Sequence, residues 1–169
     1  IQPKLINSAL LAGFAFLVAV PTAIATGVWA GLRPGSWGDH TVSTSSLVAI
    51  SLPEFVTGIL LIVIFSSTLH ILPSSSIMLP GQSPITKPIV LILPTLTLTG
   101  VLFAYIMRMT RANVIEVMET NYIRTAILKG LRTRTVIFRH VIPNAMLPTI
   151  SVVAMKIGWM LGGLIIVDS

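Results

Sequence analysis

Long apolar segments alternate with short polar ones along this chain, and the pattern predicts membrane-spanning helices. A helix needs about 20 predominantly apolar residues to cross the hydrocarbon core of a bilayer. We predict a span in each of four stretches: residues 5–32, 46–72, 88–107 and 143–167. The chain is therefore expected to be all-α, a polytopic transmembrane helical bundle forming a single domain over residues 1–169.

The composition of the chain supports lipid as its environment. Hydrophobic residues make up 54% of the sequence, only 9% of the residues are charged, and the mean hydropathy is +0.93. Ordinary globular domains carry about 25% charged residues. A soluble core of this size could not bury so much apolar surface, whereas a bilayer accommodates it.

The formal net charge of +6 comes mainly from one segment between the third and fourth predicted spans. Seven of the eleven Lys and Arg residues lie between Arg108 and Arg139. Because cytoplasmic loops carry an excess of cations, we expect a cytoplasmic loop at residues 108–140. The same orientation places residues 33–45 in the cytoplasm and Pro73–Lys87 outside. No nucleic-acid-binding module of the usual kinds is present, so we expect no nucleic acid among the partners.

Proline and glycine residues interrupt the predicted spans. Four prolines lie within or near them: Pro21, Pro53, Pro94 and Pro148. Transmembrane helices tolerate proline where neighbours or cavity water satisfy the freed carbonyl groups. Such kinks suit a transporter, and they equally suit packing in an inert bundle. Two small-xxx-small motifs, Gly27–Gly31 and Gly158–Gly162, allow helix backbones to approach closely.

The segment after residue 120 carries the start and stop signals of a short helix. Asn121 can cap a helix over Tyr122–Leu128, Gly130 can end it, and Thr133 can cap the next helix. We expect four side chains to be available for contact: Tyr122, Ile123, Ala126 and Ile127. Such a helix suits insertion into a partner protein. A helix lying on lipid headgroups, held by Arg and Lys, has the same spacing, and spacing alone leaves both interpretations open.

The run from Asn121 to Leu131, NYIRTAILKGL, resembles the coupling-loop signature of the dipeptide/oligopeptide permease family of ABC importers, approximately D-Y-[IV]-R-T-A-x-x-K-G-L. The resemblance continues through other segments in the family's order: Gly31–Trp37, Ser51–Phe55, Leu93-Pro94, Arg139-His140, Asn144-Ala145 and Pro148. It covers nearly the whole chain. Two departures are that Asn121 replaces the usual Asp and that the acidic residue of the broader E-A-A loop pattern is missing.

The resemblance implies a type I ABC importer permease fold with a cytoplasmic coupling helix, in the bacterial or archaeal cytoplasmic membrane. The partners it implies are a second homologous permease subunit, two cytoplasmic ATPase subunits, an extracytoplasmic substrate-binding protein and the surrounding lipid. The full subunit is expected to have one further helix before this chain and one after it. Dipeptides, oligopeptides, glutathione and nickel complexes remain alternative substrates.

The same resemblance implies which residues couple the chain to the ATPase: Asn121, Tyr122, Ile123, Arg124, Thr125, Ala126, Lys129, Gly130 and Leu131. The chain has no G-x-x-x-x-G-K-[ST] phosphate loop, so we expect it to be a non-catalytic subunit. ATP and Mg are then bound by the partner subunits, and this chain is expected to bind no cofactor and no metal. Gly130 is expected to form the characteristic turn of the segment.

Two charged residues fall inside predicted spans, Glu54 in the second and Lys156 in the fourth. A charge at the centre of a transmembrane helix costs about 2.5–3.5 kcal/mol on insertion scales, so it usually faces a cavity or a partner. We hypothesise that the two residues pair, or share a translocation pathway that contacts the charged termini of a peptide. A purely structural ion pair or a snorkelling Lys156 explains them as well. An alternative function is a proton-coupled secondary transporter that uses Glu54.

Overall fold

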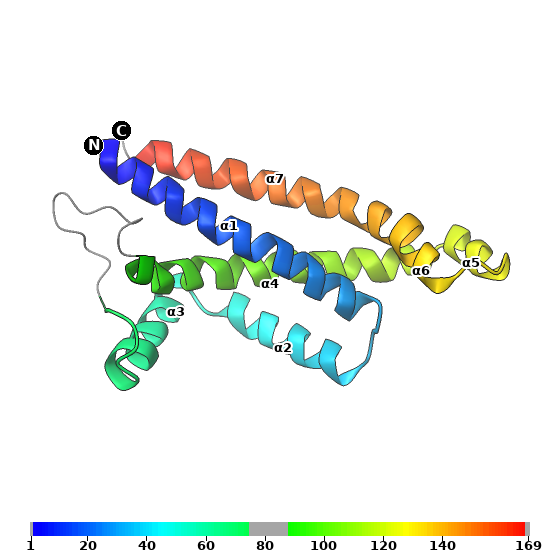
Figure 1. Ribbon diagram of the computed structural model, residues 1–169, viewed down its shortest axis with the longest axis horizontal. Coiled ribbons are helices and arrows are strands. Elements are labelled where there is room, and N and C mark those ends of the chain that lie inside the picture. Colours follow the sequence, from blue (N-terminus) through cyan, green and yellow to red (C-terminus); the bar gives the residue numbers. More distant parts are fainter. Residues whose placement is uncertain (1, 75–87, 168–169) are drawn as a thin grey trace.

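The computed structural model describes the backbone of residues 2–74 and 88–167 and the side chains of residues 13–74 and 89–158. Three long helices lie side by side along the molecule: α1 (Gln2–Gly31), α4 (Ile92–Met118) and α7 (Ile142–Val167). The central helix α4 contacts both of the others (Figure 1). A fourth helix, α2 (Trp37–Ser51), lies along α4 on the side opposite α7 in this view.

Three helical segments in the described part of the chain are long and apolar enough to cross a bilayer: Gly13–Gly31, Ile89–Met118 and Thr133–Gly158. The expected span at 46–72 is not one helix. After α2 ends at Ser51, the chain continues as α3 (Glu54–Leu61) and a π-helical segment, η1 (Ile62–Thr68). The two parts meet at an angle of 107°, so the bundle has four spans only if this bent pair counts as one.

Pro53 explains the bend between α2 and α3. A proline ring disfavours helical geometry in the preceding residue, and Leu52 is extended with φ −88° and ψ 130°. The chain then restarts a helix from the Pro53 carbonyl, which accepts hydrogen bonds from Val56 N–H at 2.9 Å and Thr57 N–H at 3.1 Å. The proline therefore separates two helices rather than kinking a single one.

Small residues line the face of α1 that packs on α4. They recur at every fourth position and all are buried: Ala15, Ala19, Ala23, Gly27 and Gly31. A Cβ atom on Gly27 would lie 2.7 Å from the Met107 carbonyl oxygen, and one on Gly31 would lie 2.9 Å from the Arg111 carbonyl oxygen. The close backbone contact predicted for Gly27–Gly31 is confirmed, and one turn earlier Ala23 packs with Ile106 and Met107 of α4.

The loop predicted at 108–140 is shorter than expected. Helix α4 continues to Met118, because its sequence contains no proline or glycine after Gly100. On the other side, α6 (Thr133–Val136) and a π-helical segment, η3 (Ile137–Val141), lead directly into α7. Only residues 119–132 connect the two long helices, and they lie at the same end of the bundle as the 32–36 turn (Figure 1). This common end is the one that the charge distribution predicts to be cytoplasmic.

Three further expectations concern glycine, proline and the external loop. Gly158 has no atom within 4 Å of a Cβ built on it, and the side chain at 162 lies outside the described residues. Pro21 and Pro148 lie inside α1 and α7, as predicted. Most of the predicted external stretch, residues 75–87, lies outside the described residues.

The α1–α4 contact predicts that Gly27→Leu destabilises the fold, since the new side chain would meet the backbone of α4. Overpacking of this kind typically costs about 1–3 kcal/mol. Thermal denaturation of the purified subunit in detergent should show a lowered melting temperature. Gly100→Leu is the matched control, because Gly100 lies on α4 with nothing within 4 Å of its Cβ position. Equal melting temperatures for the two variants would contradict the close contact.

Candidate functional site

A short helix, α5 (Asn121–Leu128), stands at the loop end of the bundle (Figure 1). Thr120 precedes it in an extended conformation, with φ −69° and ψ 149°. The Thr120 hydroxyl donates to the Val117 carbonyl at 2.5 Å and does not cap α5. Asn121 is the first helical residue rather than the cap that was predicted.

The end of α5 is defined by Gly130. This residue has φ +76°, in the left-handed region that glycine adopts without steric cost. Its N–H donates to the Ile127 carbonyl at 2.9 Å, and the Leu131 N–H donates to the Ala126 carbonyl at 3.3 Å. These two bonds form a Schellman motif, so the prediction that Gly130 ends the helix is confirmed.

One face of α5 is buried against the rest of the chain. Ile123 is fully buried and Ala126 is 8% exposed. Both pack in a cluster with residues of α4, α6, η3 and α7: Val114, Val136, Val141 and Ala145. The expectation that Ile123 and Ala126 are available for contact with a partner is corrected, because a short helix can be held in place only by burying one of its faces.

Outside the buried face, α5 and the turn after it are exposed. Four large side chains are exposed there, and we call them the end surface: Tyr122, Ile127, Leu128 and Leu131. Leu128 is 81% exposed. The other predicted coupling residues are exposed as well: Asn121, Arg124, Thr125, Lys129 and Gly130. Arg132 and Arg134, which follow in the chain, are exposed as well, so the segment combines exposed apolar and basic side chains.

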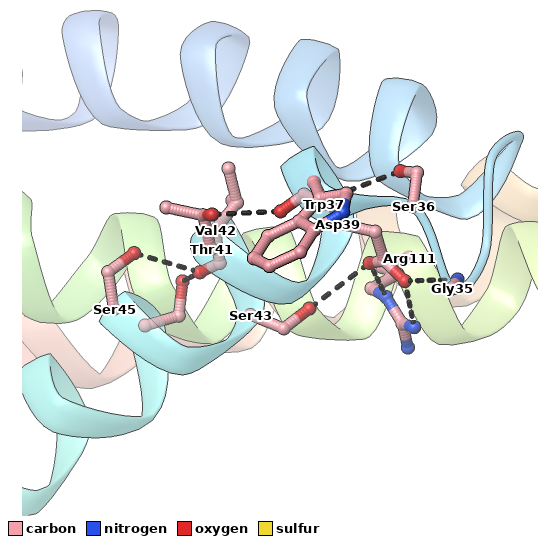
Figure 2. Close-up of polar contacts among 10 residues, drawn as sticks. Gly35, Ser36, Trp37, Asp39, Thr41, Val42, Ser43, Ser45 and Arg111 are labelled. Carbon is pink, nitrogen blue, oxygen red and sulfur yellow. Dashed lines mark hydrogen bonds and ion pairs between the residues drawn. The ribbon is translucent and has the colours of Figure 1, made fainter.

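An ion pair joins α2 to α4 near the same end of the bundle. Figure 2 shows the Asp39 carboxylate facing the Arg111 guanidinium. Arg111 Nε donates to Asp39 Oδ1, and Arg111 Nη2 donates to Oδ2 at 2.7 Å. The carboxylate also accepts a hydrogen bond from Gly35 N–H at 2.9 Å and one from the Ser43 hydroxyl at 3.2 Å. Asp39 is 1% exposed, so its charge is stabilised by these four donors and not by water.

Residues 110–114 of α4 contact three other helices, and we call this segment the contact turn. Arg111 binds α2, while Thr110 and Val114 lie against Gly27 and Gly31 of α1. On the third side, Asn113 Nδ2 donates to the Ala145 carbonyl at 3.3 Å and to the Thr149 hydroxyl at 3.1 Å, both on α7. These contacts fix the loop-end half of α4 against α1, α2 and α7.

The contact turn contains the functional candidate that the sequence reasoning missed. Asp39 and Arg111 are separated by 72 residues, and no local pattern connects them. The chain has only five acidic residues, and Asp39 stands in the first turn of a helix that contains no other acidic residue. A search for the partner of each acidic residue could have drawn attention to it.

Glu54 and Lys156 are not brought together. Glu54 begins α3 and is exposed at a pocket of about 370 Å³ between α3 and α4, towards the end opposite α5. The lining of this pocket is mostly apolar and includes Phe55, Gly58, Leu93, Pro94 and Thr97. The Lys156 ammonium lies 4.5 Å from the centroid of the Tyr105 ring on α4. No ion pair joins Glu54 to Lys156 among the side chains described, so the hypothesis of a direct pair is not supported.

The described residues also contain no group of three His, Asp or Glu side chains that could hold a metal ion. The features with functional potential are therefore three. They are the end surface on α5, the contact turn of α4, and the pocket beside Glu54.

Comparison with known proteins assigns the family. A family model described as "Binding-protein-dependent transport system inner membrane component" matches residues 23–169. The chain belongs to this family, and it is a multi-pass membrane protein of the permease type rather than an enzyme.

Several relatives carry names from peptide transport. The oligopeptide transport system permease protein OppB of Salmonella typhimurium is 38% identical over 144 residues, which cover 85% of this chain and 45% of OppB. A Brucella abortus protein named as a peptide transport system permease is 34% identical over 166 residues, or 98% of this chain and 52% of the relative. The permease y4tP of Sinorhizobium fredii, named for peptide ABC transport, is 32% identical over 153 residues, or 90% and 49%. The chain thus spans about half the length of these relatives.

The two faces of α5 predict opposite effects of truncation on stability. Ile123→Ala should destabilise the docked helix by about 2–5 kcal/mol, the usual range for removing a buried aliphatic side chain. Leu128→Ala should change stability by no more than about 0.5 kcal/mol, as exposed substitutions usually do. Amide hydrogen exchange across α5, measured beside thermal denaturation, checks both. Faster exchange in the Leu128 variant than in the Ile123 variant would contradict the assignment of the faces.

Proposed function

We propose that the chain is the membrane-spanning part of a permease subunit of an ATP-binding-cassette importer that moves peptides by alternating access. The observation that carries the proposal is the end surface, a set of exposed large side chains on and just after a helix that is anchored to the bundle by its buried face. Exposed apolar side chains gathered on one surface mark sites of protein contact. The names of the relatives support peptides as the substrate class.

The partner at the end surface is, in this proposal, a cytoplasmic ATPase subunit that binds ATP and Mg. Asn121, Tyr122, Arg124, Thr125, Lys129, Gly130 and Leu131 would contact it, while Ile123 and Ala126 hold α5 on the bundle. Because α5 is anchored beside the contact turn, a displacement of α5 reaches α4 directly. ATP shifts the conformational equilibrium only if the ATPase contact differs in free energy between the two states.

Family membership supports the remaining proposed partners. A binding-protein-dependent system requires an extracytoplasmic substrate-binding protein. A second homologous permease subunit and a second ATPase subunit complete the proposed assembly. The exposed apolar side chains along α1 and α7, such as Leu17 and Met155, would then lie against lipid or against the second permease subunit.

The pocket beside Glu54 is the proposed contact for a cationic group of the passing peptide. Among the described residues that line the pocket, Glu54 is the one charged side chain, and the apolar surroundings strengthen its interaction with a cation. Broken helices commonly form the substrate sites of transporters, and Glu54 stands directly after the break at Pro53. Lys156 is a second candidate for the pathway; its half-buried ammonium is stabilised by the Tyr105 ring.

Reconstitution of the complete transporter in proteoliposomes tests the proposal. We expect uptake of peptide to require ATP on the ATPase side, the ATPase subunits and the binding protein. Uptake driven by a pH gradient without ATP would instead establish proton-coupled transport through Glu54.

A variant at the end of α5 tests the coupling role of this segment. Gly130→Val should reduce peptide uptake by about tenfold or more while ATP hydrolysis continues, because a β-branched residue disfavours positive φ and displaces the end surface. Gly130→Asn is the matched control, since asparagine tolerates this conformation and nothing lies within 4 Å of the Cβ position. Uptake and ATP hydrolysis are measured in the same vesicles. Full uptake by the valine variant would refute the coupling assignment.

The role of Glu54 is tested with two substrates. Glu54→Gln should raise the KM for a tripeptide with a free amino terminus by about tenfold, as expected for loss of one charge-assisted contact. The KM for the same tripeptide with an acetylated amino terminus should stay unchanged. Uptake kinetics at saturating binding protein provide both values. An equal effect on the two substrates would remove the proposed contact with the ammonium group.

A further inference from the structure

We propose that Asp39 and Arg111 are positioning residues for transport, whose ion pair makes α2 follow α4 when α5 is displaced. The inference rests on the proposed function, because it concerns how movement of α5 reaches the rest of the bundle. Neither residue belongs to the coupling segment or to the pocket. In this proposal, the pair passes movement of α4 near the coupling segment to α2, which leads to the pocket.

The first argument is that few side chains other than Asp39 hold α2 on α4. Only two of its residues are buried, Asp39 and Ser46, and the Ser46 hydroxyl donates to Val42 of the same helix at 2.7 Å. Val42 is partly buried against the cluster of α1 and α4 residues around Met107. Four other large side chains of α2 are exposed: Trp37, Leu47, Val48 and Ile50. In lipid, burial of such residues would supply little driving force for association in any case. The position of α2 therefore depends strongly on the Asp39–Arg111 pair.

The geometry of the pair makes this attachment directional. Two guanidinium nitrogens of Arg111 contact the two oxygens of Asp39, and this forked arrangement restrains rotation as well as separation. The Asp39 carboxylate also accepts a hydrogen bond from the Gly35 N–H. The Asp39 N–H in turn donates a hydrogen bond to the Ser36 hydroxyl at 3.2 Å (Figure 2). The first turn of α2 and the loop before it are thus bound to α4 as one unit.

At one end, the pair is close to the anchor of α5. Val114 follows Arg111 by less than one turn of α4 and packs in the same buried cluster as Ile123 and Ala126. The backbone of α1 lies against this turn too, since a Cβ on Gly31 would be 2.9 Å from the Arg111 carbonyl oxygen. A displacement of α5 must therefore move the Arg111 side chain or break close contacts.

At the other end, α2 leads to the bend and to the pocket. The chain turns through 107° after Ser51, and α3 then forms the pocket together with the first half of α4, around Leu93 and Pro94. The loop-end half of α2 is attached to α4 by charge, while its far end joins α3 only through the extended Leu52 and Pro53. Movement of α2 with α4 would change the angle at this connection and hence the shape of the pocket.

The experiment uses the complete transporter in proteoliposomes and measures peptide taken up per ATP hydrolysed. We expect Arg111→Gln and Asp39→Asn each to lower this ratio about tenfold, the size of a typical coupling free energy between two sites, while ATP hydrolysis persists. Arg108→Gln is the control, because Arg108 lies one turn earlier on α4 and its charge takes part in no ion pair among the described residues. An unchanged ratio in both pair variants would overturn the proposal. Parallel loss of uptake, hydrolysis and thermal stability would overturn it as well, because the pair would then only hold the fold together.

A distance measurement provides a second, independent readout. This chain contains no cysteine, so spin labels can be placed at Ser45→Cys on α2 and Glu119→Cys beside α5, both exposed positions. With the pair intact, the distance between the labels should be the same with and without ATP. In Arg111→Gln it should broaden or change with nucleotide. A nucleotide-dependent distance in the protein with the intact pair would contradict the inference, whereas absence of ATP-dependent uptake by that protein would overturn the proposed function and the inference with it.

Discussion

The close approach of α1 to α4 is the contact on which the other features of the structure depend. Apolar side chains gain little by leaving lipid for each other, so helices in a bilayer associate where their backbones can come near. The small residues from Ala23 to Gly31 provide that proximity, and Gly27 and Gly31 lie directly against the backbone of α4. Once α4 is fixed in this way, its other faces can receive α2 and α7.

Polar contacts add specificity to this arrangement at one level of the bundle. Within the contact turn, Arg111 binds Asp39 of α2, and Asn113 binds Thr149 of α7. Buried polar groups of this kind stabilise only the arrangement in which all their partners are present. The contact turn contributes Val114 to the cluster that anchors α5. The segment of α4 that binds three other helices therefore also supports the surface proposed to receive the ATPase.

The two proposed working sites lie at opposite ends of α4. The end surface follows its last residue, and the pocket beside Glu54 involves its first turns. A straight helix with one end in each site is a direct mechanical connection between them. The bent α2–α3 segment is a second mechanical connection. The Asp39–Arg111 pair attaches it to α4 near the loop end, and it bends at Pro53.

Local signals in the sequence were sufficient for the all-α bundle, for the long helices α1, α4 and α7, and for the end of α5 at Gly130, because each depends on residues within a few positions of one another. The shared end of the 32–36 turn and the 119–132 loop followed from counting spans.

Other features depend on which surfaces meet. The inward position of Ile123, the contact of Lys156 with Tyr105 and the Asp39–Arg111 pair required the packed bundle, since their partners are distant in sequence and were selected by the way α1, α2 and α7 surround α4. The break at Pro53 lies between these cases: the position of the proline was visible in the sequence, but only the structure shows that Leu52 is extended and that the two helices meet at 107°.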